Sequence, residues 1–219
     1  MKRIGLLSIA LAMALTVACN RNAPSNTTAT TAANEPNAIG TAGEADRNTV
    51  STGDKDFVKD VSTANMAEIE LGQLAAQRAV SADVKQFAQM MVTDHTKAGA
   101  DLKQAVSQWN IPMASALDEK HQDLKVKLSK LQGRQFDHEY MEAMVQGHQD
   151  VMDKLETRVD GHGALGRDKD TNPVPEKSDN HVTSSINTWA AATLPAVHHH
   201  LDQAKMIEEK IDRSRNTTH

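Results

Sequence analysis

Four side chains that can bind a metal ion or form a buried hydrogen-bond network are embedded in otherwise apolar stretches of this sequence. In a helical reading, each has small or apolar residues one turn before and one turn after it, so each points to the packed side of its segment. Burying such groups singly is unfavourable, because each needs a hydrogen-bond partner or a ligand. We therefore expect them to meet; they are Glu68, His95, His148 and His200.

Two arrangements would satisfy these four groups. In the first, Glu68 accepts hydrogen bonds from the histidines, and the closed polar network fixes the register of the helices. In the second, three imidazoles and one carboxylate surround a single transition-metal ion, a ligand set suited to zinc, iron or copper. The residue types favour the network, because core histidines are more often hydrogen-bonded than metal-bound and a network needs no ion. The mononuclear metal site stays open as the alternative.

Three further residues are candidates for supporting roles. Asp94 adjoins His95 but lies about 100° away around a helix. It could therefore form a hydrogen bond with a histidine of another helix, but this position on the flank favours a residue that is simply exposed to solvent. Tyr140 is expected to reach a polar partner in the core, as buried tyrosines usually do. Asp137 is expected to interact with the positive end of its own helix.

The sequence argues against two kinds of active site. In His198-His199-His200 successive residues of a helix point apart, so only His200 faces inward. Di-iron bundles use Glu-x-x-His on two of their helices, whereas valine stands three residues before each inward histidine, at Val92, Val145 and Val197. No nucleophile–base arrangement and no phosphate-binding loop is recognisable, which favours a protein that is not an enzyme.

The elements that position these residues are predicted to be helices, because apolar residues recur at three- and four-residue steps between 54 and 212. The first two helices meet at a tight turn over 80–83, with Ser81 as N-cap, and must be antiparallel neighbours. The second is expected to end near Asn110, before Pro112. No alternating strand pattern occurs.

The second half of this region predicts a short connecting helix and two long ones. The short helix spans about 117–131 and is expected to stop at Gly133. A long helix follows over about 136–155, and a Gly- and Pro-rich segment at about 161–180 reads as a loop insertion. The last helix is expected over 181–212, kinked or interrupted by Pro195, and leaves a tail over 213–219.

The N-terminal residues 1–19 have the pattern of an export signal. Lys2 and Arg3 precede an apolar stretch that is too short to span a bilayer comfortably, and the segment ends at Cys19. "LTVAC" resembles the lipobox of bacterial lipoproteins, in which the cysteine carries the lipid and becomes the mature N-terminus. We therefore expect lipid attachment at Cys19. Cleavage of an ordinary signal, with a free thiol left near the start of a soluble protein, is the alternative.

Residues 20–53 are predicted to be a disordered tether. More than half of them are Thr, Ala or Asn, and the only large aliphatic residues are Ile39 and Val50. Such a segment cannot bury enough apolar surface to offset its ordering entropy. The whole chain has 219 residues and a formal net charge of −5 with both signs mixed throughout, so nothing indicates a nucleic-acid partner.

Three stretches, 67–103, 128–150 and 194–204, resemble in order and spacing the bacterial envelope family known as domain of unknown function 4142. The resemblance implies a ferritin-like bundle in an outer-membrane protein, and it implies no agreed biochemical activity. The loop insertion before the last helix departs from the family pattern. The matching positions are a first-helix glutamate (Glu68), an Asp-His pair (Asp94, His95), an "FD…Y" segment (Phe136, Asp137, Tyr140), the next histidine (His148) and an "LP…H" motif (Leu194, Pro195, His200).

These observations predict an all-α protein, a ferritin-like four-helix bundle with one short extra connecting helix. We expect it to be exported, lipid-anchored on the periplasmic side of the outer membrane, and built around an inward Glu/His network, with its biochemical role open. One alternative is a ferritin-like protein that binds one zinc, iron or copper ion. The other is an envelope module that binds a protein partner.

Overall fold

The structure, a computed structural model, describes residues 46–160 and 173–216. The predicted signal segment, Cys19, most of the predicted tether, much of the loop insertion and the end of the tail lie outside these residues. The described part consists of α2 (Thr52–Arg78), α3 (Ala82–Val106), a 3₁₀ turn η1 (Ser107–Trp109), α4 (Glu119–Ser129), α5 (Gly133–Glu156) and α6 (His181–Asn216). Within it the only β contact is an isolated bridge between Val159 and Pro175. The all-α prediction is confirmed.

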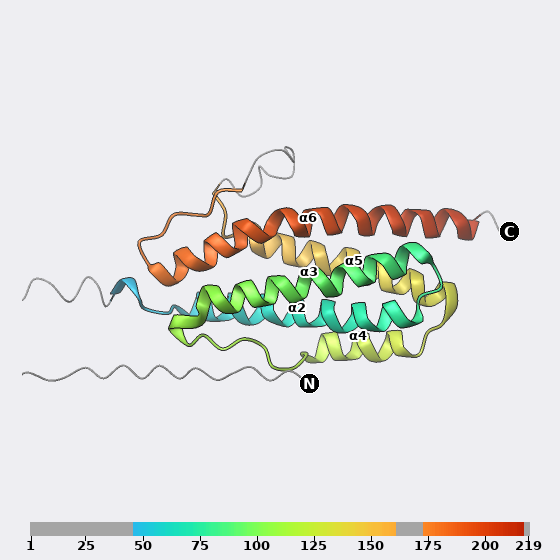
Figure 1. Cartoon of the computed structure of the whole chain (residues 1–219), viewed down its shortest axis with the longest axis horizontal. Helices are drawn as coiled ribbons and strands as arrows, with labels where there is room; N and C mark the ends of the chain where they lie inside the picture. The colour runs from blue at the N-terminus through green and yellow to red at the C-terminus, as the bar shows by residue number, and fades with distance from the viewer. Residues whose placement is uncertain (1–45, 161–172, 217–219) are drawn as a thin grey trace, which may run out of the picture. The chain divides into compact units, whose positions relative to one another are not determined.

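Four long helices form a closed ring of neighbours, because α2 packs on α3, α3 on α6, α6 on α5, and α5 on α2. Neighbours in this ring run antiparallel, whereas α3 and α5 run in the same direction (Figure 1). The connection between α3 and α5 therefore returns along the bundle, and it contains α4, which packs on the outside against α2 and α5. The predicted short connecting helix is thus present.

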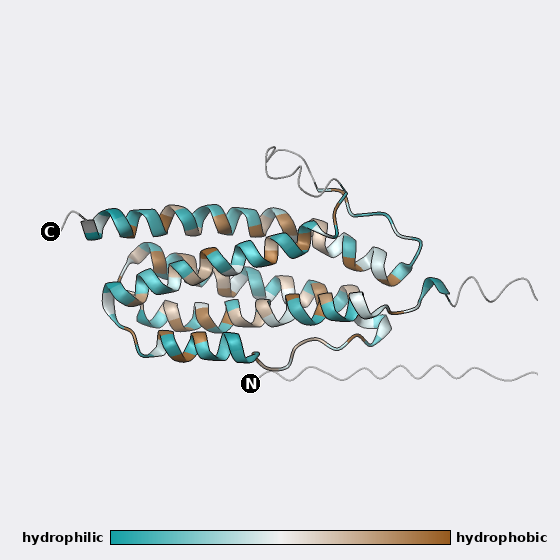
Figure 2. Ribbon diagram, turned by 180° about the vertical axis from the view of Figure 1, so that it is seen from behind, coloured by the Kyte–Doolittle hydropathy of each residue, from teal (hydrophilic) through white to brown (hydrophobic). Residues whose placement is uncertain are grey.

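The apolar core falls into two clusters separated along the bundle axis. On α2, the first cluster ends at Val61 and the second begins at Leu71; on α6, they meet between Val197 and Ala204. The same division occurs on α3 and α5. Brown positions recur along each of the long helices in Figure 2, with teal positions between them, as expected for helices that bury one face. The gap between the two clusters is the place where the sequence puts the four inward polar residues.

The helix boundaries predicted at glycine and proline positions have different outcomes in the structure. Gly133 does not stop α4, which ends at Ser129; it is the first residue of α5, with φ of 61°, a conformation that favours glycine. The second helix ends as predicted, with η1 reaching Trp109 and Asn110 in the left-handed region. Pro195 does not interrupt α6, which continues through it.

The turn between α2 and α3 is held by an acid from another helix. Ser81 occupies the N-cap position, but its side chain makes no capping bond. Instead, the buried carboxylate of Asp137 accepts hydrogen bonds from the backbone N–H groups of Val80 (3.0 Å) and Ser81 (2.7 Å). The prediction that Asp137 serves the end of its own helix is therefore wrong, because its side chain spans to the neighbouring turn.

Replacing Asp137 with alanine is expected to lower the free energy of unfolding by about 2 kcal/mol, since hydrogen bonds to charged groups contribute roughly 1.5–3 kcal/mol. Urea unfolding of the metal-free protein measures this loss. Asp83→Ala, at an ion pair with Lys210 in which both side chains are largely exposed, is the control and should cost less than about 1 kcal/mol. Equal losses in the two variants would contradict the role of Asp137.

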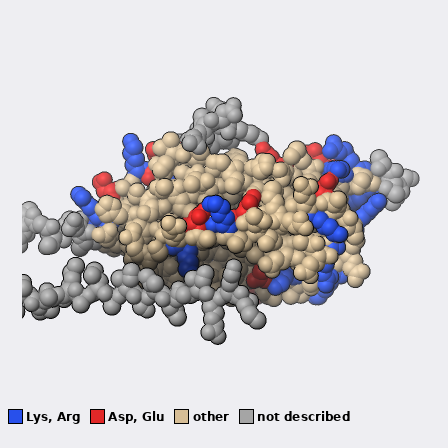
Figure 3. All heavy atoms as spheres, in the orientation of Figure 1, with Lys and Arg blue, Asp and Glu red and all other residues tan. Residues whose placement is uncertain are grey.

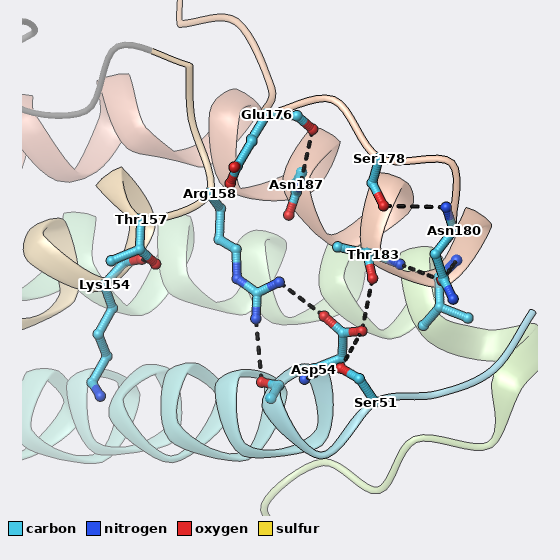
Figure 4. Close-up of polar contacts among 12 residues, drawn as sticks. Ser51, Asp54, Lys154, Thr157, Arg158, Glu176, Ser178, Asn180, Thr183 and Asn187 are labelled. Carbon is cyan, nitrogen blue, oxygen red and sulfur yellow. Dashed lines mark hydrogen bonds and ion pairs between the residues drawn. The ribbon is translucent and has the colours of Figure 1, made fainter. Parts of the chain in front are cut away.

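At the opposite end of α2, a buried carboxylate joins three elements (Figure 4). Asp54 is 1% exposed and accepts hydrogen bonds from Ser51 (2.7 Å), Thr183 of α6 (2.9 Å) and Arg158, which follows α5 (2.8 Å). Arg158 also lies over the ring of Phe57, 4.4 Å from its centroid. Both carboxylate oxygens of Asp54 thus accept hydrogen bonds, from donors on three different segments. We infer that this cluster stabilises the end of the bundle.

Charged side chains of both signs occur on the face in Figure 3, and broad areas of it carry neither sign. This distribution agrees with the mixed charge of the sequence. None of the helices in the described residues combines the length and the apolar content that a bilayer-crossing segment requires.

Candidate functional site

The layer between the two apolar clusters contains three histidines that face one another. His95 comes from α3, His148 from α5 and His200 from α6, and all three are buried. Their ring centroids form a nearly equilateral triangle with sides of 5.6 Å (His95–His148), 5.5 Å (His95–His200) and 5.4 Å (His148–His200). One potential ligand atom of each lies within 4.8 Å of those of the other two. The structure therefore brings together the three histidines that the sequence selected.

The ring of His148 is fixed by its own helix. Its Nδ1 lies 2.8 Å from the backbone oxygen of Met144. A carbonyl oxygen can only accept, so Nδ1 carries the proton and donates it. The other ring nitrogen, Nε2, then carries a lone pair, and it is buried with no hydrogen-bond partner.

The ring of His95 is fixed by a residue that the sequence prediction missed. Its Nδ1 lies 3.1 Å from Oδ1 of Asn65, so Nδ1 donates and the buried Nε2 is left with a free lone pair. Gly99 makes room for this amide, since a Cβ there would lie 2.7 Å from Asn65 Nδ2. Asn65 stands three residues before Glu68 on the same helical face, which was the available signal.

The ring of His200 is fixed from the neighbouring helix. Its Nε2 lies 3.0 Å from a carboxylate oxygen of Asp94, which is 45% exposed. Nε2 therefore donates, and the buried Nδ1 is left without a partner. Asp94 does lie on the flank of α3, as predicted, but the interpretation as a merely solvated residue is wrong, because it orients a histidine of α6.

The three histidines thus share one pattern. In each, one ring nitrogen donates to a fixed oxygen, and the other is buried, unprotonated and unpaired. Metal-binding histidines commonly hold their second nitrogen in this way, on a carboxylate or a carbonyl. Burial lowers the pKa of His95 to about 3 and that of His148 to about 4, and it also lowers the pKa of His200. All three rings are neutral at pH 7, as metal ligands must be.

Glu68 lies beside this triangle on α2. Its Oε1 is 3.8 Å from His148 Nδ1, beyond hydrogen-bond distance, and its Oε2 is buried with no partner. Gly147 faces it across the helix interface, since a Cβ there would lie 2.8 Å from Oε1. Burial raises the pKa of Glu68 to about 8, so this pair is not an ion pair in the metal-free protein at pH 7. No closed hydrogen-bond network joins Glu68 to the histidines among the described residues.

Tyr140 packs close to this layer but does not complete it. Its ring stacks on Phe136 with centroids 6.1 Å apart and meets the edge of Phe87. The hydroxyl group is buried and has no hydrogen-bond partner among the described residues, so the expected polar contact is absent. Burial and the nearby Glu68 raise the pKa of Tyr140.

His199 of the tract and a second group of possible ligands lie outside the triangle. His199 Nε2 lies 2.8 Å from the amide of Gln203, outside the triangle. Ligand atoms of His138, Glu139 and Glu142 also lie within 4.8 Å of one another, but these residues are half-buried or exposed. Exposed acidic groups commonly gather without an ion, so this group by itself indicates less than the buried histidines.

Replacing Glu68 with glutamine is expected to change how the stability of the metal-free protein depends on pH. Because the folded-state pKa of Glu68, about 8, exceeds the ordinary glutamate value of 4.5, its contribution to stability is complete below pH 4.5 and is lost as the pH rises through 8. The free energy of unfolding of the wild type, minus that of Glu68→Gln, should therefore fall between pH 5 and 8, by at most about 1.4 kcal/mol for each pH unit. Urea titrations at four or five pH values measure this difference.

The three histidines act in the opposite direction, because their lowered pKa values cost stability as the pH falls through 6.5. Both proteins retain them, so the difference isolates Glu68. Parallel pH profiles for the two proteins would mean that Glu68 is already ionised in the folded state.

The fold and this layer define an all-α helical bundle with a buried three-histidine cluster at its centre. The chain belongs to the family described as Domain of unknown function (DUF4142), whose model matches residues 40–164. The matched range contains Glu68, His95 and His148 and ends before α6, which supplies His200. No curated protein matches the chain, and no solved structure matches it.

Proposed function

We propose that this protein binds one transition-metal ion in the centre of its helical bundle, through His95, His148 and His200. The observation that carries the proposal is the pattern of ring nitrogens: each histidine has one nitrogen held by an oxygen and one buried nitrogen with nothing to bind. An unpaired buried polar group costs roughly 1–3 kcal/mol. Three of them around one point are costly in a metal-free protein and become favourable once an ion is bound.

The ligand chemistry indicates the class of ion. Imidazole nitrogen suits zinc, copper and iron, whereas calcium and magnesium prefer oxygen ligands. Three protein nitrogens leave a further coordination position. Glu68 lies beside the triangle, 3.8 Å from the His148 nitrogen that donates to Met144, so its carboxylate would reach that position only after its side chain moved toward the unpaired nitrogens. Ring nitrogens up to 4.8 Å apart need only small side-chain movements to reach ligand bonds of about 2.0–2.1 Å to one ion. This arrangement supports the metal-binding alternative over the closed polar network.

Metal content is the direct test. Elemental analysis of the purified protein, with any affinity tag removed and with His198→Ala and His199→Ala to suppress surface binding, should give one ion of zinc, copper or iron per chain. Loading with Co²⁺ should produce the visible absorption bands of a nitrogen-coordinated ion. For the loading experiments, each metal is supplied at a concentration far above the dissociation constants typical of such sites. The proposal would be overturned if every one of these metals then gave less than about a tenth of an ion per chain.

We also propose that the protein acts in the bacterial envelope, anchored to the outer membrane through a lipid on Cys19. The proposal is supported by the basic, apolar and small-residue order of residues 1–19 and by the position of the single cysteine of the chain. Cells grown with labelled palmitate should incorporate the label into the wild type and not into Cys19→Ala. Fractionation should then move that variant from the membrane pellet to the soluble periplasmic fraction; an unlabelled wild type would contradict the anchor.

A further inference from the structure

A cleft of about 580 Å³ opens on the side of the bundle bordered by α2, α4 and α5. Glu68 forms part of its lining, and so does Met144, whose backbone oxygen holds the ring of His148. The cleft therefore extends from the protein surface to Glu68, beside the layer of the three histidines, although none of these histidines lines it. Small residues from α2 and α5 keep this side open: Ala64, Ala67, Ala143 and Gly147.

All the lysines that line this cleft form ion pairs, whereas several of its carboxyl groups do not. Each lining lysine is paired with a lining carboxylate, in Lys120–Asp150 (3.2 Å), Lys127–Glu139 (2.6 Å) and Lys154–Asp60 (2.7 Å). Three other carboxyl groups of the lining, those of Glu68, Glu142 and Glu208, form no hydrogen bond and no lysine or arginine ion pair among the described residues. Burial raises the pKa of Glu68 to about 8, so in the metal-free protein at pH 7 the unpaired carboxylates that suit a cation are those of Glu142 and Glu208.

The carboxyl groups without a lysine partner lie both near the surface of the cleft and at its inner end. Glu142 belongs to a group with His138 and Glu139 whose ligand atoms lie within 4.8 Å of one another near the surface. Burial raises the pKa of Glu208, and the charges of Asp212 and Glu142 raise it further, whereas His138 lowers it. At the inner end, Glu68 is buried, and its Oε2 has no partner. A cation would relieve the repulsion outside and supply the missing partner inside.

We propose that this cleft is the route by which a divalent transition-metal ion reaches the three histidines. Glu142 and Glu208 attract the hydrated ion, and Glu68 is the last carboxylate before the imidazoles. Each step exchanges a water ligand for a protein oxygen or nitrogen, without any change in oxidation state, and coordination by Glu68 releases its proton to water. Clefts lined by charge of one sign raise the association rate of oppositely charged ligands about 10- to 1,000-fold. The inference rests on the proposed metal site and adds how the ion enters it.

Stopped-flow mixing of the full-length protein with Co²⁺ tests the route through its charges. Glu142→Gln/Glu208→Gln should bind Co²⁺ with an association rate constant at least about tenfold lower and less dependent on salt. Asp56→Asn/Asp123→Asn removes the same charge from exposed positions that do not line the cleft. This control should keep the wild-type rate within about twofold. Equal slowing in both double variants would overturn the route, because it would reflect net charge alone.

A plug in the cleft tests the route through its shape. Ala143→Phe places a large ring in the lining at a position that is not itself a proposed ligand. A blocked path raises only the free-energy barrier that the ion crosses on entering and leaving the site. Association and dissociation of Co²⁺ should therefore slow by the same factor, and the equilibrium dissociation constant should stay unchanged. Circular dichroism and the unchanged dissociation constant show that the variant is folded.

The outcomes separate this inference from the proposed function. If the wild type binds Co²⁺ and neither the charge variant nor the plug alters the rates, the route is wrong and the three-histidine site stands. If the wild type binds no Co²⁺ or Zn²⁺ at all, the proposed function itself fails. Slowing in both variants with an unchanged dissociation constant for the plug supports the cleft as the entrance.

Discussion

A chain in which His148 is replaced by alanine should lose stoichiometric binding of a transition-metal ion. Removing a residue that merely orients a ligand typically lowers metal affinity 10- to 100-fold. Loss of a ligand itself should therefore cost at least about a hundredfold. Competition titrations of Zn²⁺ against a chromophoric chelator measure the change, and His95→Ala and His200→Ala should behave in the same way.

The structure also predicts an order of effects around this site. Asp94→Ala leaves all three free nitrogens in place but removes the carboxylate that orients His200. Its affinity should fall by an intermediate factor of about 10–100. His199→Ala, the adjacent residue outside the triangle, should bind as tightly as the wild type. A His148→Ala variant with wild-type affinity would exclude this cluster as the site.

Thermal unfolding should report the same site. A ligand that binds only the folded state at a hundred times its dissociation constant stabilises that state by about 2.7 kcal/mol. For a domain of this size that corresponds to an increase in Tm of roughly 5–10 °C. Excess Zn²⁺ should therefore raise the Tm of the wild type by this amount and leave that of His148→Ala unchanged.

The second large effect is expected at Asp54. Removing one partner of a buried ion pair typically costs 3–5 kcal/mol, because the other charge is left unpaired. Arg158 is 15% exposed, and among the described residues its only ion pair is with Asp54, so we expect Asp54→Ala to lower the free energy of unfolding by about 3 kcal/mol. Metal affinity should stay unchanged, since Asp54 lies at the end of the bundle.

Asp60→Ala is the matched control. Asp60 lies on the same helix and also pairs with a basic residue of the α5 segment, Lys154, at 2.7 Å, but both side chains are nearly half exposed. Exposed ion pairs contribute about 0–1 kcal/mol. Urea unfolding should therefore separate the two variants by at least about 2 kcal/mol; similar values would mean that burial does not strengthen the Asp54 cluster.

The Asp54 cluster also predicts sensitivity to acid. Burial alone would raise the pKa of this carboxyl group, but hydrogen bonds from Ser51, Thr183 and Arg158 together with the charge of Arg158 outweigh it, and the pKa is lowered from 3.8. Its contribution to stability is therefore complete above pH 3.8 and is lost as the pH falls through the lower folded-state value. The stability difference between the wild type and Asp54→Ala should shrink below pH 4.

The helices and their inward faces could be predicted from the sequence because both depend on local periodicity. A residue such as His95, with apolar neighbours one turn away on each side, faces the core whatever the other helices do. The turn at 80–83 likewise follows from its length, since two helices joined so closely must be antiparallel neighbours. Gly133 shows the limit of this reasoning, because a glycine can end one helix or begin the next, and local sequence does not distinguish the two.

The sequence alone thus determined an all-α bundle and the identity of four inward polar residues, Glu68 among them. Only the tertiary structure decided what these residues can do. Asn65 and Asp94 select which nitrogen of His95 and of His200 is free, yet they lie 30 and 106 residues from their partners. Periodicity gives the direction of a side chain from its helix, but a hydrogen bond depends on helix rotation, separation and rotamer, which are set by packing between helices. That packing decides which nitrogen of each histidine is hydrogen-bonded and which is left unpaired.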